Sequence, residues 1–224
     1  MSGKYMAYVG SYSYTGKAKG ITVFDVDVEN GMFKERCEIE VDNSSYVIAS
    51  SDGKTLYSIA DEGVVSFRIL PNGSLARLNS SSIRGMRGCH LCTDEEDKYV
   101  FVSGYHDGKT TVLNLNPDGS VGKIVDGVFD RGYGSVAERN FRPHVTCTRR
   151  MPDNRFVLSV DNGIDQVKIY RFNDKEQKLV QVDAIRCDLE SAPRHFRYSK
   201  DGKFIYLMYE LKKAIEVYTY KTGD

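Results

Sequence analysis

The chain has 224 residues, of which 31 are basic and 31 acidic, so its formal net charge is zero. No lysine or arginine cluster is dense enough to bind a phosphate backbone, and no apolar run approaches the ~20 residues of a membrane span, so neither nucleic acid nor membrane is expected as a partner. The lack of an apolar leader and the odd set of five cysteines favour a soluble, cytoplasmic protein with reduced thiols.

The predicted elements are strands throughout. The 15 tyrosines, the absence of tryptophan and the 5 prolines suit a sheet protein with tight turns. β-rich runs at residues 5–9, 21–28 and 32–41 come first. A complete unit follows, in which turns at Asp52-Gly53 and Asn72-Gly73 help to separate strands expected at residues 46–50, 55–60, 64–70 and 74–78. Helical periodicity is not sustained anywhere.

The same order of strand, turn, strand, break and strand recurs along the chain. Further copies begin near Cys89, His144 and Arg194, which places one unit roughly every 45 residues. Four short strands in such a period are typical of a β-propeller blade. The first unit lacks its opening strand and the last stops before its fourth. We therefore expect an all-β protein in which residues 1–224 form a single, incomplete propeller domain of about four and a half blades.

The two incomplete ends would leave unpaired strand edges, which closed propellers avoid. We therefore expect a chain cut short of a full ring, or self-association through the exposed blade edges. A glycine-rich insertion at residues 126–142 is long for a propeller connection and is expected on the same rim as His144. Such a loop is either a lid or substrate loop, or plain loop variation.

The antiparallel path of a blade predicts where polar groups gather. The start of the first strand and the end of the second lie on the same rim, opposite the Asp-Gly turns. First strands line the axial channel of a propeller, so groups at these places are expected to converge on its mouth. The residues placed there are His90, His144, Arg194 and His195 at strand starts, and Asp61, Glu62, Tyr105, His106, Asp161 and Glu210 after second strands.

Such a set contains the parts of an acid–base site. His144 offers a base or acid near neutral pH, Arg194 a cation for developing negative charge, and Glu210 a carboxylate partner. The alternative is that these side chains only hydrogen-bond neighbouring blades. This structural interpretation is stronger for His90 and His195 than for His144.

Several short segments, spread over nearly the whole chain, resemble those of a known family in sequence and in order. They are YVGSYS, GITVFDVD, SSDGKTLYSIADEGVVSFRI, CHL, YHDGKTTVLNLNPDGSVG, PH, APRH and YEL. In this order they resemble the seven-bladed lactonase propellers, which include bacterial 6-phosphogluconolactonases and the related fungal carboxy-muconate lactonizing enzymes. The resemblance implies a propeller of seven blades, of which this chain holds only part.

The resemblance also implies an activity, the hydrolysis of 6-phosphogluconolactone to 6-phosphogluconate in the pentose phosphate pathway, without a cofactor or metal. It places the family's active-site histidine, arginine and glutamate at His144, Arg194 and Glu210. His144 would activate water, and Arg194 would bind the sugar phosphate or the oxyanion. A second family arginine lies on a later blade that this chain lacks. The substrate is expected to contact His90, His195, Tyr105 and His106.

Other functions stay open. A muconate lactonizing enzyme would use the same acid–base set to close or open a lactone, and a non-catalytic scaffold would bind a partner through the same rim. A metal-dependent gluconolactonase propeller would need a carboxylate-rich axis, whereas this axis is expected to be basic and rich in imidazole. Cys89-His90-Leu91-Cys92 has zinc-like spacing, but alternate residues of a strand face apart and no second pair follows, so no metal site is expected.

Overall fold

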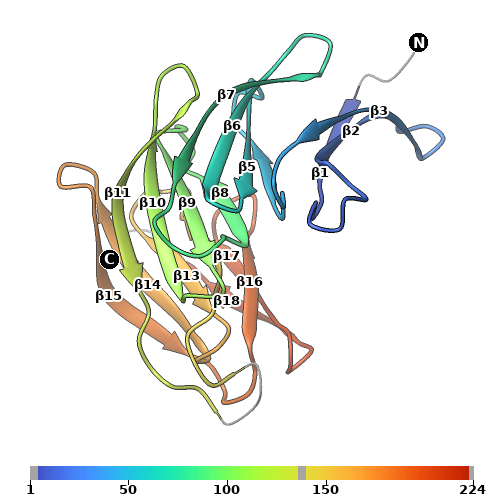
Figure 1. The fold of residues 1–224 in the computed structure, drawn as a ribbon. Helices are drawn as coiled ribbons and strands as arrows, with labels where there is room; N and C mark the ends of the chain where they lie inside the picture. Colours follow the sequence, from blue (N-terminus) through green and yellow to red (C-terminus); the bar gives the residue numbers. More distant parts are fainter. Residues whose placement is uncertain (1–4, 136–139, 222–224) are drawn as a thin grey trace.

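The computed structural model describes residues 5–135 and 140–221, whose strands form five antiparallel sheets, as the predicted all-β propeller requires (Figure 1). Each sheet is one blade, and we number the blades 1 to 5 in chain order. No helix in the described part of the chain is long and apolar enough to cross a membrane. The three-stranded blades are blade 1, with β1 (Tyr5–Gly10), β2 (Gly20–Asp27) and β3 (Met32–Glu40), and blade 5, with β16 (Pro193–Tyr198), β17 (Phe204–Tyr209) and β18 (Ile215–Thr219).

The other three blades have four strands each, in the order of the sequence. Blade 2 comprises β4 (Val47–Ala49), β5 (Thr55–Ala60), β6 (Gly63–Ile69) and β7 (Leu75–Ser82). Blade 3 comprises β8 (His90–Thr93), β9 (Tyr99–Gly104), β10 (Lys109–Leu115) and β11 (Val121–Phe129). Blade 4 comprises β12 (Val145–Arg150), β13 (Val157–Asp161), β14 (Gln166–Asn173) and β15 (Lys178–Arg186).

The hydrophobic core lies between neighbouring blades. The second strands β5 and β9 are buried along their whole length, because blades pack on both of their faces, whereas the outermost strand β15 is mostly exposed. Between blades 3 and 4, the ring of Phe172 meets those of Tyr99 and Phe101 edge-on, with centroids 4.8 and 6.0 Å apart. Such aromatic pairs add to the hydrophobic stabilisation that comes from burial itself.

The predicted Asp-Gly turns share one set of contacts. In the turn after β4, the Asp52 carboxylate accepts hydrogen bonds from Ser50 Oγ at 2.7 Å and from the Lys54 amide at 3.0 Å. Gly53 supplies the left-handed backbone with φ of 68°. In blade 5, Asp201 and Gly202 repeat this arrangement after β16. Because both turns use the same residue types for the same contacts, the repeat can be recognised in the sequence.

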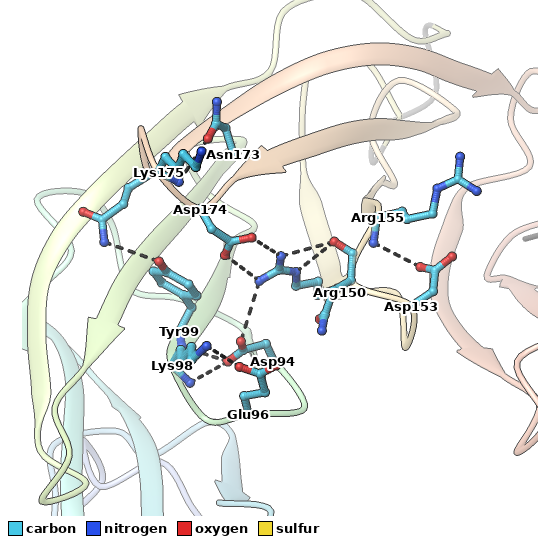
Figure 2. A network of polar contacts seen from close by, with 12 residues as sticks. Asp94, Glu96, Lys98, Tyr99, Arg150, Asp153, Arg155, Asn173, Asp174 and Lys175 are labelled. Carbon is cyan, nitrogen blue, oxygen red and sulfur yellow. Dashed lines mark hydrogen bonds and ion pairs between the residues drawn. The ribbon is translucent and has the colours of Figure 1, made fainter. Parts of the chain in front are cut away.

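An inter-blade ion cluster lies on the Asp-Gly turn rim (Figure 2). Arg150, at the end of β12, is 2.7 Å from Asp174 of its own blade and 3.7 Å from the buried carboxylate of Asp94 in blade 3. Its guanidinium also donates to the carbonyl of Asn154 at 3.2 Å and lies over the ring of Phe172. Arg150 therefore links blades 3 and 4 and neutralises a buried acid.

The observed boundaries differ from the predicted ones mainly in the outer strands. The strand at residues 55–60 is as predicted, but β4 is only three residues long and β7 runs four residues beyond its predicted end. β11 extends to Phe129, so the first part of the insertion is strand because it pairs with β10. Residues 136–139 of the insertion lie outside the described residues.

Blade 5 presents an uncovered apolar face. Phe204, Tyr206 and Met208 of β17 are about two-fifths exposed, while Ile215 and Val217 of β18 are 65% and 58% exposed. In blades 2 to 4 the equivalent strands are covered by a following blade. Apolar side chains clustered on one sheet face are typical of a surface that binds another protein or another part of the fold.

Candidate active site

The predicted rim geometry is confirmed by the strand pairing. Val145 at the start of β12 pairs with Asp161 at the end of β13, and Pro193 at the start of β16 pairs with Tyr209 at the end of β17. Each pair is followed by a register shift, which leaves Thr146 and Arg194 as the extra residues. A bulge of this kind re-aims side chains at the end of a strand. Thr146 Oγ1 donates to the Arg194 carbonyl at 2.6 Å, so the two bulges also join blades 4 and 5.

His144 is held in one tautomer. Its Nδ1 is 2.6 Å from the carbonyl oxygen of Tyr105, and because a carbonyl only accepts, Nδ1 carries the hydrogen. The neutral ring therefore has its lone pair on Nε2. The imidazole stacks on the Tyr105 ring, with centroids 4.2 Å apart and planes 10° apart, and the residue is 4% exposed.

Burial lowers the pKa of His144 below its ordinary value. The hydrogen bond to Tyr105 opposes this effect, and the charges of Arg142 and His106 reinforce it. His144 is therefore neutral at pH 7, with an accepting Nε2, which is the state that a general base requires.

Two buried carboxyls, those of Asp161 and Asp130, lie next to the backbone of His144. Asp161 is fully buried, and its Oδ1 accepts from the amides of His144 at 2.8 Å and Gly163 at 2.9 Å. Burial and the neighbouring carboxyl of Asp130 raise the pKa of Asp161. Asp130 accepts from Tyr170 Oη at 3.1 Å and lies 3.5 Å from Lys168 Nζ. A proton held by Asp161 lets it donate to Asp130, which explains how two carboxyls lie buried side by side near a single cation, Lys168.

Asn162 connects this part of the rim to blade 5. Its backbone amide donates to the His144 carbonyl at 2.9 Å, and its side-chain amide lies 3.4 Å from Glu210 Oε2. The same oxygen of Glu210 accepts from Arg194 Nη1 at 2.6 Å. The Arg194 side chain remains 48% exposed, so the ion pair faces solvent at the rim. The structure thus brings Arg194 and Glu210 together directly and ties both to the His144 backbone.

His106 lies beside Tyr105, with ring centroids 5.6 Å apart, and its side chain is exposed. Tyr105 and His106 therefore adjoin His144, as predicted. His90 and His195, by contrast, form a separate group with each other, with ring centroids 5.2 Å apart. They contact arginines of the inner strands and make no described contact with His144. Their assignment to substrate binding at the His144 site stays a prediction that this geometry does not favour.

His90, His195 and Cys147 also place possible metal-ligating atoms within 4.8 Å of one another. Two features oppose a cation there. His90 Nε2 lies 3.2 Å from a guanidinium nitrogen of Arg149, and His195 Nε2 lies 2.7 Å from one of Arg197. Burial raises the pKa of the Cys147 thiol. Occupied imidazole lone pairs and a neutral thiol among arginines are poor ligands for a metal ion.

Several residues of this site escaped prediction from the sequence. Asp130 and Asn162 were not singled out, and neither was Asn140, whose amide donates to the Asn162 carbonyl at 2.7 Å and to Asp165 Oδ1 at 3.0 Å. The sequence Asp161-Asn162-Gly163 at a strand end is a visible signal for a polar turn. Nothing local in the sequence links Asp130 to Asp161, because the loop after β11 brings them together.

Comparison with known proteins agrees with the propeller fold. Residues 6–224 match the family described as "Lactonase, 7-bladed beta-propeller". The chain is 31% identical over 218 residues to a 6-phosphogluconolactonase of Bacillus subtilis, covering 95% of this chain and 61% of that protein.

Two crystal structures are similar. A Bacteroides fragilis protein, solved as a candidate 6-phosphogluconolactonase, superimposes with a TM-score of 0.89 at 32% identity, covering 98% of this chain and 64% of the other. The periplasmic gluconolactonase of Pseudomonas aeruginosa gives a TM-score of 0.90 at 25% identity, covering 97% and 64%. The chain thus spans less than two thirds of the length of each of these proteins. With the family match over residues 6–224 and the blade structure in agreement, the chain belongs to the lactonase family of seven-bladed β-propellers.

Proposed function

We propose that this protein hydrolyses a lactone at the rim formed by His144, Arg194 and Glu210. The observation that carries the proposal is the state of His144. Its Nδ1–H is committed to the Tyr105 carbonyl, which leaves Nε2 as a neutral base in a ring fixed by stacking. Because the contact with Tyr105 uses only Nδ1, Nε2 keeps its lone pair and can accept a proton from water.

The reaction that fits this arrangement is attack of water on the lactone carbonyl. His144 Nε2 takes a proton from the water as its oxygen bonds to the carbonyl carbon, and the carbonyl oxygen becomes an oxyanion. The half-exposed Arg194 supplies positive charge for that oxyanion. Collapse of the tetrahedral intermediate breaks the ring C–O bond, and the imidazolium returns its proton to the leaving alkoxide, which gives the open hydroxy acid.

Glu210 acts on Arg194. The Glu210 carboxylate holds the Arg194 guanidinium in place through the 2.6 Å contact. It also accepts from the side-chain amide of Asn162, whose backbone amide donates to the His144 carbonyl. Removal of Glu210 should therefore lower the reaction rate by releasing Arg194 rather than by removing a proton carrier.

The substrate that we propose is 6-phosphogluconolactone, with 6-phosphogluconate as the product, no cofactor, and a place in the pentose phosphate pathway of the cytoplasm. Support comes from the B. subtilis relative, whose name is 6-phosphogluconolactonase. Nothing in the site or in the relatives described above favours the muconate reaction.

The test is release of 6-phosphogluconate from the lactone by the 224-residue chain, with the spontaneous rate subtracted. We expect His144→Ala to lower the enzymatic rate by a factor of about 100 or more. Arg68→Gln is the matched control, because Arg68 lies on the opposite rim and donates to the Asp118 carbonyl at 2.6 Å. Thermal unfolding of each variant verifies folding. No rate above the spontaneous one, or equal rates for wild type and His144→Ala, would refute the proposal and favour a binding scaffold.

A further inference from the structure

Two neighbouring arginines of β12 have opposite surroundings. Arg150 is paired with the carboxylates of Asp94 and Asp174. Arg149 is also buried, with 8% exposure, but makes no ion pair in the described part of the chain. Its contacts are Cys92 Sγ at 3.4 Å and His90 Nε2 at 3.2 Å. A buried guanidinium without an anionic partner is unfavourable in a folded protein, so its counter-charge is expected to come from outside the chain.

Two buried N–H groups in this place also lack an acceptor. Arg149 Nε has no hydrogen-bond partner. His90 Nε2 faces the Arg149 guanidinium, which can only donate, so His90 carries its hydrogen on Nδ1. That Nδ1 is likewise buried and without a partner. Buried donors nearly always have a hydrogen-bond acceptor in native proteins. Two buried N–H groups without one, beside a cation without an ion pair, therefore indicate that an acceptor is missing here.

The group joins the first strands of blades 3, 4 and 5. His90 of blade 3 meets His195 of blade 5, two blades further along the chain, with ring centroids 5.2 Å apart. His195 is half-buried, and Arg197, which donates to its Nε2 at 2.7 Å, is exposed. The members of the group that face solvent are therefore His195 and Arg197.

The remaining side chains of the group contribute no negative charge near pH 7. Burial raises the pKa of the Cys92 thiol to about 11 and also raises that of Cys147, so both sulfurs are neutral. Arg197 makes no ion pair among the residues that the structure describes. Glu95 accepts from Tyr198 Oη at 3.2 Å rather than from either arginine. The group is thus a cluster of cations and imidazoles.

We propose that Arg149, with His90, His195 and Arg197, forms an anion site in the axial channel that binds a phosphate group. A phosphate offers several acceptor oxygens on one centre, which suits the guanidinium donors of Arg149 and Arg197. The site lies on the inner strands, apart from the His144 turn, and its occupancy does not depend on whether the protein hydrolyses a lactone.

The probe is inorganic phosphate, titrated into the 224-residue chain by calorimetry in chloride buffer of fixed ionic strength. We expect one site whose affinity falls at least about tenfold in Arg149→Gln. Because Arg149 is buried, Arg197→Gln serves as a second variant whose exposed side chain can be removed without loss of folding, and it should also weaken binding. Arg171→Gln is the control, since Arg171 is exposed on β14 and should leave the affinity unchanged.

Two further titrations identify the source of the phosphate. Binding of 6-phosphogluconate that depends on Arg149, without binding of gluconate, assigns the site to a sugar phosphate; binding of inorganic phosphate alone assigns it to the free ion. Equal phosphate affinity in wild type, Arg149→Gln and Arg197→Gln would overturn the proposal. So would stoichiometric uptake of zinc by the metal-free chain without any binding of phosphate, since the cluster would then be a metal site.

Discussion

Replacement of Asp161 by asparagine tests whether the Asp161 carboxyl is protonated in the folded protein at neutral pH. Asp161 is fully buried, and its pKa is raised by burial and by the adjacent Asp130. Asparagine keeps the oxygen that accepts from the amides of His144 and Gly163, and its NH₂ group can donate to Asp130 as a protonated carboxyl would. The Asp161→Asn variant should therefore fold at every pH at which the wild type folds.

The magnitude follows from proton linkage. An aspartate in the unfolded chain has a pKa of about 3.9, so between pH 5 and 7 the unfolded state has lost the proton that the folded state keeps. The folded state then binds about one more proton, and its stability falls by about 1.4 kcal/mol for each unit rise in pH. Over these two units, wild type should lose about 2.7 kcal/mol relative to Asp161→Asn.

The assay is urea unfolding followed by circular dichroism at pH 5, 6 and 7 and constant ionic strength. The quantity of interest is the free energy of unfolding of the variant minus that of wild type, which should rise with pH. Asp183→Asn is the control, because Asp183 is exposed on β15 and the difference there should be flat. A flat difference for Asp161→Asn as well would show that Asp161 is ionised in the folded protein and would refute the proton assigned to it.

Four other predictions concern the site, the blades and the exposed face. A Cβ at Gly163 would overlap the Arg142 carbonyl oxygen and lie 2.8 Å from His144 Cδ2, so Gly163→Ala should destabilise the fold by about 1–3 kcal/mol and lower the hydrolysis rate; an unchanged urea midpoint would contradict this. Arg150→Met leaves the Asp94 carboxylate buried without its cation, so it should lower stability by about 3 kcal/mol, and Asp94→Asn in the same chain should restore part of that loss in urea unfolding. The neutral form of His144 is the active one and its pKa is lowered, so kcat/KM should hold from pH 7.5 to below 6.5 and fall only in more acidic buffer; an acid limb with its midpoint above 6.5 would argue against His144 as the base. The apolar face of blade 5 should drive self-association, and Val217→Lys should reduce the mass measured by light scattering at a given concentration, whereas a monomeric wild type would rule this out.

The repeat itself is readable from the sequence because its signals are local. The Asp52-Gly53 and Asp201-Gly202 turns each need a short side chain that accepts from the backbone and a residue with positive φ, and both requirements are met within three positions. β-rich runs on either side of such turns can only pair as antiparallel neighbours. Alternation of strand direction then places His144, Arg194 and Glu210 on one rim without any knowledge of packing.

Contacts between blades are what the sequence could not reveal. The tautomer of His144 depends on a carbonyl of blade 3, and the proton on Asp161 depends on Asp130 in the loop that precedes blade 4. Arg149 and Arg150 are identical neighbours in the sequence, yet one meets two carboxylates and the other meets none. Their difference comes from the strand, which turns successive side chains toward opposite faces. The sequence by itself determined the strands, the turns and the rim; only the tertiary structure decided which charges are neutralised, because the neutralising groups come from blades distant in the chain.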